Sequence, residues 1–134
     1  MAEKIEGRAR EILEAANICI VASIEKDGVP FTAPVWVDMD GDHVTVNTAE
    51  GRHWMENVRR DKRVRLLILN MENPYEYVTI KATLAEDTQE GADDHINAMA
   101  KKYLGQDEYP FRQPGEQRVI FKFAPERVHL NAAG

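Results

Sequence analysis

The chain has 134 residues, of which 43% are hydrophobic and 30% are charged, and its formal net charge is −6 at pH 7. This length suits one ordinary domain around a single core, so we expect one domain over residues 1–134, and the composition excludes a disordered or fibrous protein. The acidic balance disfavours a general affinity for nucleic-acid phosphates, so we expect no nucleic-acid partner.

The single cysteine and the first residues bear on the cellular compartment. Cys19 cannot form an intrachain disulfide or a cysteine-rich zinc site, which fits a reducing environment. The opening stretch, MAEKIEGRAREILEAAN, has acidic residues throughout and no long apolar core, so it predicts neither a signal peptide nor a membrane anchor. Its apolar residues recur at helical spacing and predict an amphipathic helix over residues 5–16. We therefore expect a cytoplasmic protein without a membrane partner.

Short apolar runs predict six strands, and Asp-Gly turns join the first three into a meander. The second strand contains Pro30 and Pro34, which lack a backbone N–H donor and therefore belong at a sheet edge or a bulge. The fourth contains Leu66 to Leu69, a run that predicts burial on both faces. The sixth can extend past Pro125. In chain order, the predicted strands cover residues 17–25, 29–39, 43–48, 63–70, 77–87 and 118–123.

Helical spacing of apolar residues predicts two more helices. One covers residues 52–60 and turns Trp54 toward the core. The other follows Thr88, a candidate N-cap, and ends near Gly105. The loop over residues 106–117 comes next, with two prolines and two aromatic residues, and its composition suits a loop that covers a site.

These elements predict a mainly β fold with flanking helices. Six strands in hairpin order favour a closed or nearly closed antiparallel barrel, because closure removes unpaired edges. Side chains fill the interior of so small a barrel, so a ligand as large as a nucleotide has to bind in a groove at a rim or a subunit interface. The pattern therefore points to a dimer.

The stretch from Val44 to Val64 reads as a strand, a turn and a short helix. Unpaired N–H groups at such a helix start attract anions, and Thr48, Arg52 and His53 can add donors beside them. A plainer interpretation is that Thr48 caps the helix and that the basic run over residues 59–63 is a solvated face. Both interpretations stay open at this stage.

Several short motifs occur in a fixed order along the chain. They are Asp27-Gly28, Pro34-Val35-Trp36, Thr48 with Gly51-Arg52-His53, the turn from Asn57 to Asp61, Asn73-Pro74-Tyr75, Lys102-Tyr103-Leu104-Gly105, Tyr109-Pro110 and Arg118-Val119. With these motifs the chain resembles the split-barrel flavin- and deazaflavin-binding proteins, the superfamily of pyridoxamine 5'-phosphate oxidase, over nearly its whole length. Its form is most similar to the short, single-domain coenzyme F420-dependent oxidoreductases.

The resemblance implies a six-stranded antiparallel split β-barrel of the FMN-binding type that forms a homodimer, with one cofactor per subunit at the interface. Thr48, Arg52 and His53 would hold the cofactor phosphate, although the family usually has Lys where this chain has His53. The loss of that permanent cation weakens anion binding or shifts it to Arg59, Arg60 or Lys62. The full set of expected cofactor-binding residues is Pro34, Val35, Trp36, Asn47, Thr48, Ala49, Gly51, Arg52, His53 and Asn57.

The function implied is hydride transfer between reduced coenzyme F420, a deazaflavin, and a small organic acceptor. Two alternatives are an FMN-binding oxidoreductase or flavin reductase, and a protein that binds a flavin-like or haem-like ligand without turnover. The cofactor carries the chemistry in such enzymes, so we assign no catalytic side chain. His95 beside Asp93 and Asp94 lacks further metal ligands, so we expect a solvated helix face there and no metal site.

Three aromatic residues have two interpretations each. Trp36 can pack in the barrel or contact a cofactor ring, and we rate the two about equally. Tyr75 and Tyr109 lie in proline-containing loops, where an aromatic side chain more often anchors the loop than reaches a ligand.

Overall fold

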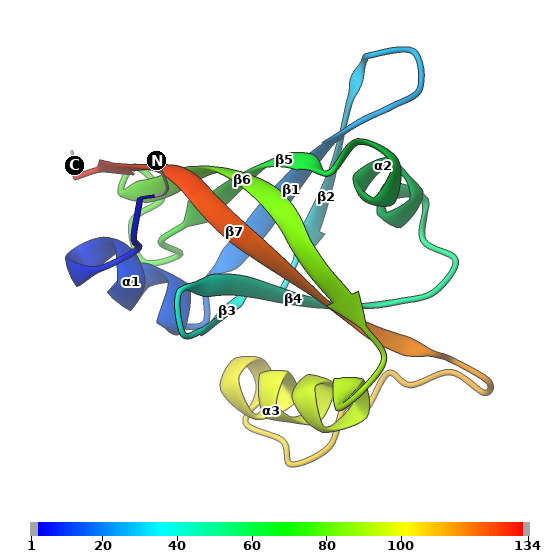
Figure 1. The fold of residues 1–134 in the computed structure, drawn as a ribbon. Helices are drawn as coiled ribbons and strands as arrows, with labels where there is room; N and C mark the ends of the chain where they lie inside the picture. The colour runs from blue at the N-terminus through cyan, green and yellow to red at the C-terminus, as the bar shows by residue number, and fades with distance from the viewer. Residues whose placement is uncertain (1–2, 133–134) are drawn as a thin grey trace.

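The computed structural model describes residues 3–132 (Figure 1). Ten elements follow one another along the chain, three helices and seven strands within this range. They are α1 (Gly7–Glu14), β1 (Ile18–Ile24), β2 (Pro30–Val35), β3 (Asp38–Asp40), β4 (His43–Ala49), α2 (His53–Asp61), β5 (Arg63–Leu69), β6 (Tyr77–Thr88), α3 (Ala92–Leu104) and β7 (Arg118–Asn131). Within residues 3–132 the structure has no helix that is long and apolar enough to cross a membrane.

The seven strands form one antiparallel sheet in the order β2-β1-β5-β6-β7-β4-β3. The prediction of a closed, six-stranded barrel is therefore wrong in strand number and in closure, because no pairing joins β2 to β3 within residues 3–132. The two edge strands are nevertheless consecutive in the chain. The sheet must curl until Trp36 and Val37 bridge its edges, which gives a barrel-like shape with a split.

The second predicted strand breaks at Val37, where both backbone groups leave the ladder and bind side chains of α3. The Val37 N–H donates to the Tyr103 hydroxyl at 3.0 Å, and the Val37 carbonyl accepts from Lys102 Nζ at 2.6 Å. Pro34 fits this position because β2 pairs only with β1, so its missing N–H leaves no gap in a ladder. The expected irregularity of this stretch is confirmed, and it arises because Val37 hydrogen-bonds to side chains of α3 instead of to a neighbouring strand.

The interior of the sheet is filled by large apolar side chains, as a barrel of this size requires. Phe121 and Phe123 are fully buried, and Trp54 packs edge-to-face on Phe121 with ring centroids 5.4 Å apart. The prediction that Trp54 belongs to the core is confirmed. Any large ligand therefore has to bind outside this interior.

Strand β5 has one fully buried face within a single subunit, and burial of the other face against a partner subunit stays a prediction. Leu66 and Ile68 are fully buried, but Leu67 and Leu69 on the other face are only half-buried. The outer face of β5 carries the exposed Arg63 and Arg65 at one end and the apolar Leu67 and Leu69 at the other, and within residues 3–132 the two leucines stay only partly covered.

Helix α3 packs against the outer face of β4 and β7, as seen below the sheet in Figure 1. It begins at Ala92 rather than at Thr88, since β6 continues to Thr88. The Thr88 hydroxyl accepts the N–H of Glu90 at 3.1 Å and so stabilises the turn before the helix, and Gly91 is the N-cap with φ of +74°. The predicted N-cap is therefore wrong. Strand β7 continues past Pro125 as predicted, with an irregularity in its pairing to β6 nearby.

The Tyr103 hydroxyl is expected to contribute measurably to stability. It donates to the Asn17 carbonyl at 2.6 Å and accepts from the Val37 N–H, so Tyr103→Phe leaves both backbone groups without this partner. We expect the free energy of unfolding in urea to fall by about 1–3 kcal/mol. Tyr75, which is 74% exposed, is the control, and Tyr75→Phe should change the free energy little. Equal effects of the two substitutions would contradict the assignment.

The Arg8–Glu76 pair predicts a specific pH dependence of stability. Two Arg8 nitrogens donate to the Glu76 carboxylate at 2.9 and 2.7 Å, and with Asn70 they lower its pKa from 4.5 to about 2. A carboxyl with a lowered folded-state pKa stabilises the fold above its unfolded pKa and loses that contribution as the pH falls through the folded value. Between pH 4.5 and 2, Glu76→Gln should therefore lose less stability than the wild type. The exposed Glu72→Gln variant should follow the wild-type curve.

Candidate functional site

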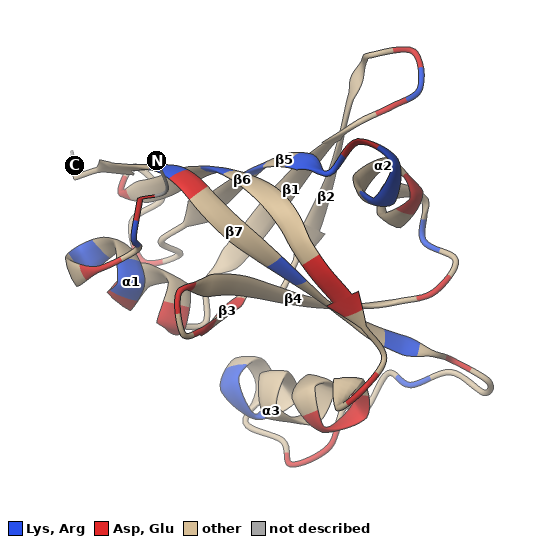
Figure 2. Ribbon diagram, viewed as in Figure 1, with Lys and Arg blue, Asp and Glu red and all other residues tan. Residues whose placement is uncertain are grey.

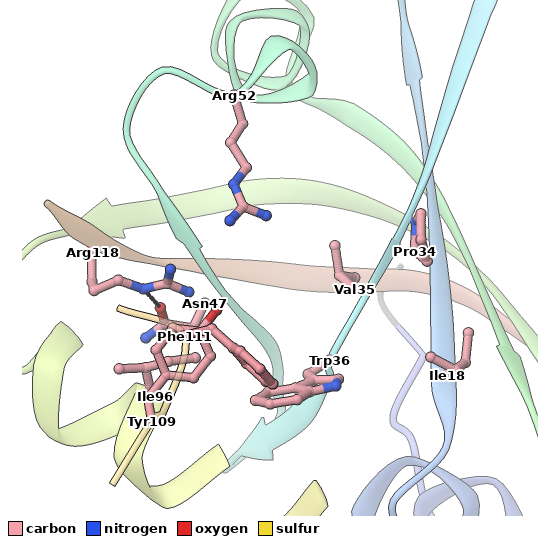
Figure 3. A pocket seen from close by; sticks show the side chains of 10 residues that line it. All are labelled: Ile18, Pro34, Val35, Trp36, Asn47, Arg52, Ile96, Tyr109, Phe111 and Arg118. Atoms are coloured by element: carbon pink, nitrogen blue, oxygen red, sulfur yellow. Dashed lines mark hydrogen bonds between the residues drawn. The ribbon is translucent and has the colours of Figure 1, made fainter. Parts of the chain in front are cut away.

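A cavity of about 290 Å³ opens between the end of β2, the start of α2, and the face of the sheet that α3 covers (Figure 3). One side is apolar and the other presents two guanidinium groups and an amide. The lining residues are Ile18, Pro34, Val35, Trp36, Asn47, Arg52, Ile96, Tyr109, Phe111 and Arg118.

Stacked and edge-to-face rings form the aromatic wall of the cavity. Trp36 stacks on Tyr103 with centroids 4.9 Å apart and planes 5° apart, and Tyr109 meets Trp36 edge-on at 6.0 Å. Phe111 continues the series from Tyr109 at 5.7 Å and is 57% exposed. Trp36 therefore packs on α3 rather than inside the barrel, and it also lines the cavity, so contact with a cofactor ring stays a prediction.

The loop after α3 supplies Tyr109 and Phe111 and is fastened to that helix. The Tyr109 N–H donates to Asn97 Oδ1 at 2.9 Å, and Arg112 pairs with Asp93 at 2.9 Å. The prediction that this loop covers a site is consistent with its place on the cavity.

Arg118 lies at the polar end of the cavity and is almost completely buried, with 5% of its surface exposed. Its Nε donates to Asn47 Oδ1 at 2.9 Å, its Nη1 donates to the Glu116 carboxylate, and its guanidinium lies 5.0 Å from the Tyr109 ring centroid. Burial opposes ionisation of Glu116, but the Gln113 N–H and Arg118 donate to the carboxylate and hold its pKa below the usual value.

His95 is part of the same polar network. The Asn47 amide donates to the Ala92 carbonyl at 2.9 Å and lies 2.9 Å from His95 Nδ1, so this ring nitrogen acts as the acceptor. Burial lowers the pKa of His95, which keeps the imidazole neutral. The prediction of a solvated helix face is therefore wrong for His95, which is half-buried. No cluster of metal-ligating side chains is found among residues 3–132.

Arg52 approaches the cavity from the start of α2, for which it is the N-cap residue (Figure 3). Its side chain is exposed, and within residues 3–132 it makes no ion pair or side-chain hydrogen bond. Gly51 precedes it with φ of +98°, a conformation that glycine adopts without strain. The guanidinium and the backbone N–H groups of His53 and Trp54 are therefore available to an anion, whereas the Met55 N–H already donates to the Arg52 carbonyl.

Five of the ten expected cofactor-binding residues line the cavity, namely Pro34, Val35, Trp36, Asn47 and Arg52. The other five do not. Thr48 and Asn57 point into the interior, where Thr48 contacts Met55 Sδ at 3.8 Å and Asn57 donates to Ser23 Oγ at 3.2 Å. Ala49 and Gly51 contribute backbone to the turn before α2. His53 turns away from the cavity and binds Glu25 at 2.7 Å.

The basic run over residues 59–63 covers the last turn of α2 and the start of β5 (Figure 2), and its arginines make contacts within the fold. Arg59 pairs with Glu50 at 2.8 Å and with Asp87 at 3.3 Å, and Arg60 donates to the Ile24 carbonyl. Arg63 pairs with Asp61 at 2.6 Å. Neither Arg59 nor Arg60 lines the cavity, so neither supplies the positive charge that a Lys at position 53 would bring.

The chain matches the family model described as pyridoxamine 5'-phosphate oxidase over residues 5–132. The chain belongs to the pyridoxamine 5'-phosphate oxidase family. This is the family that the order of motifs predicted. No curated protein sequence matches the chain.

Solved structures similar to this family member share its fold at low sequence identity. A structure named F420 Reductase has a TM-score of 0.80 at 18% identity, covering 93% of this chain and 98% of that one. A conserved hypothetical protein from Mycobacterium tuberculosis has a TM-score of 0.71 at 17% identity, covering 97% and 87%. HupZ from Group A Streptococcus has a TM-score of 0.64 at 17% identity, covering 93% and 92%. At these identities the likeness concerns the fold.

Proposed function

We propose that this family member is an oxidoreductase that transfers a hydride between reduced coenzyme F420 and a small organic acceptor, with FMN as the alternative cofactor. One observation carries the proposal: Arg52, at the start of α2, lines the same cavity as the apolar and aromatic side chains of Pro34, Val35 and Trp36. Within residues 3–132 the Arg52 side chain makes no ion pair or hydrogen bond. Such a cavity suits a ligand with an anionic arm and a flat ring.

The part of the cavity beside Arg52 and the start of α2 fits a phosphate. Arg52 offers a guanidinium fork whose geometry matches two phosphate oxygens, and α2 adds N–H groups and the positive end of its dipole. His53 is held by Glu25, so Arg52 would be the principal side chain on the phosphate. Phosphate binding would therefore depend more on Arg52 alone than in family members that also have the Lys.

The apolar end fits a flavin or deazaflavin ring. Val35 and Trp36 present apolar surface, and the ten lining side chains include no carboxylate, imidazole or thiol. When bound, the cofactor supplies the hydride, and the protein binds, orients and excludes water. The preference for F420 over FMN draws on the likeness to the structure named F420 Reductase.

We also propose that the protein is a homodimer with the cavity at the subunit interface. β1 and β2 contain no charged residue, and the outer faces of β1 and β5 pair Ile18 with Leu69 and Ile20 with Leu67, all half-buried. Ile18 and the exposed Pro34 belong to this surface and to the rim of the cavity. A second copy seated here would cover apolar surface and border the site.

Introducing a negative charge on the apolar face tests the dimer. Ile20→Glu and Leu67→Glu each place a carboxylate within the proposed interface, so light scattering after gel filtration should give the monomer mass. Asp42→Lys, in the exposed turn before β4, should leave the dimer intact. A monomeric wild type, or a dimer that both Glu variants retain, would contradict this part of the proposal.

Anaerobic turnover tests the enzyme assignment. Reduced coenzyme F420, mixed with a quinone or a conjugated enone, should be reoxidised only when the protein is present, and fluorescence of the oxidised cofactor reports the rate. If the protein binds F420 yet accelerates none of these reactions, the non-catalytic binding function replaces the oxidoreductase. The same assay with reduced FMN separates the two cofactors.

A further inference from the structure

The guanidinium of Arg118 has donors to spare at the wall of the cavity. Its Nε is satisfied by Asn47 and its Nη1 by Glu116, but Nη2 has no hydrogen-bond partner within residues 3–132. Arg118 lines the cavity, and only 3% of its side chain is exposed. This nitrogen is not among the buried atoms that lack a partner, so it reaches the open space of the cavity, where an oxygen acceptor can meet it.

The charge of Arg118 is already compensated. Glu116, whose side chain is 8% exposed, pairs with Nη1 and is ionised because its pKa is held low. An anion entering this end of the cavity would gain the attraction of Arg118 but meet the repulsion of Glu116. A neutral oxygen acceptor gains the hydrogen bond without that repulsion.

The surroundings of Arg118 favour a flat ligand. The Tyr109 ring lies under the guanidinium at 5.0 Å, and Trp36 and Phe111 extend the aromatic surface away from it. An oxygen bound to Nη2 and conjugated to a planar system would place that system along these rings. Asn47 and Glu116 fix the orientation of the donor from the opposite side.

We propose that Arg118 and Glu116 form a subsite for the conjugated carbonyl oxygen of a planar compound, and that the compensated charge selects a neutral carbonyl over a carboxylate. Two sources share this chemistry, the acceptor of the proposed reaction and a ring carbonyl of the cofactor. The role in turnover rests on the proposed function, whereas the binding selectivity does not.

Reduction of a conjugated enone is a reaction in which the Arg118 donor would have a role, because the carbonyl oxygen has to be held while the double bond is reduced. The hydride, supplied by the reduced deazaflavin or flavin of the proposed function, forms a C–H bond at the β carbon. The C=C pair shifts and leaves negative charge on the oxygen, and a proton from water then adds at the α carbon. Arg118 would donate its hydrogen bond to the oxygen and so orient the β carbon toward the hydride donor, and protonation of the α carbon returns the oxygen to a neutral carbonyl.

Three matched probes test the selectivity on the apo-protein: 2-acetonaphthone, 2-naphthoate and 2-ethylnaphthalene, which present a ketone, a carboxylate and an alkyl group on the same ring. We expect the wild type to bind the ketone about tenfold or more tightly than the hydrocarbon, by fluorescence titration. The Arg52→Ala protein should keep this ratio. A wild type that binds the ketone no better than the hydrocarbon, or the carboxylate better than the ketone, overturns the proposal without any variant.

Glu116→Gln should bind the carboxylate probe more tightly, a gain that a misfolded protein would not show. Removing the compensating charge should raise the affinity for 2-naphthoate about tenfold or more in the Arg52→Ala background, with little change for 2-acetonaphthone. Glu108→Gln, an exposed change on the same loop, is the control. No gain for the carboxylate in the Glu116 variant overturns the role of charge compensation.

A competition separates the two sources of the carbonyl. If 2-acetonaphthone still binds to protein saturated with F420 or FMN, the subsite serves the acceptor, and if the cofactor displaces it, the subsite serves the cofactor ring. Failure of every cofactor to bind would remove the proposed function and leave the ketone selectivity standing, so the two failures are distinguishable.

Discussion

Replacing Arg52 with alanine is expected to weaken the binding of coenzyme F420 or FMN about ten- to a hundredfold. Arg52 makes no ion pair or side-chain hydrogen bond within residues 3–132, so its loss should cost the fold little. A charged hydrogen bond to phosphate contributes about 1.5–3 kcal/mol, which corresponds to this range in the dissociation constant. His53 is engaged by Glu25 and Arg118 is compensated by Glu116, so we expect neither residue to replace the lost cation.

Two further variants make this result specific. Arg52→Lys keeps the charge but not the planar fork, so it should fall between the wild type and the alanine variant. Arg127→Ala removes an exposed arginine from the far half of β7 and should leave the affinity unchanged. Equal affinities in the Arg52→Ala and Arg127→Ala proteins would show that the phosphate does not lie at the start of α2.

Arg118→Met is expected to cause the largest loss of stability, about 3–5 kcal/mol in urea unfolding at pH 7, because it leaves the Glu116 carboxylate buried without its partner. The double variant Arg118→Met with Glu116→Leu removes both charges and should recover most of the loss. A double variant less stable than the single one would show that the pair contributes more than mutual compensation.

The pH dependence of this pair has a defined sign. The pKa of Glu116 is lowered from 4.5 in the folded state, so the stabilisation is present above pH 4.5 and is lost as the pH falls through the folded value. The difference in stability between the wild type and Arg118→Met should therefore shrink on acidification. A constant difference from pH 7 to pH 3 would contradict this account.

The strands were predictable because alternation and turn residues are local signals. The predicted ranges match the observed strands within two residues except at two places: β7 runs on to Asn131, beyond the predicted 118–123, and the second predicted strand breaks at Trp36 and Val37, where the chain crosses from one sheet edge to the other. Nothing local predicts that crossing, since Lys102 and Tyr103, which bind Val37, lie some 65 positions further along the chain.

The candidate site was half predictable for the same reason. Its strand and helix-start residues belong to short motifs that were assigned to the site, whereas Ile18, Ile96 and Phe111 reach the cavity only through the fold, and Arg118 belonged to a motif without an assigned role. Arg118 carried one readable signal, a charged residue directly before the apolar run Val119, Ile120 and Phe121. His53 is the opposite case: its position in the sequence predicted a role in the site, but its side chain pairs with Glu25, 28 positions earlier, and does not line the cavity.

Equilibrium titration of the purified apo-protein with coenzyme F420, FMN and FAD tests the central claim most directly. Fluorescence should show F420 binding with a micromolar or lower dissociation constant, weaker FMN binding, and loss of affinity in the Arg52→Ala protein. Tighter binding of FMN would move the protein to the flavin-dependent members of its family. If none of the three cofactors binds, the proposal of a cofactor-dependent oxidoreductase is wrong.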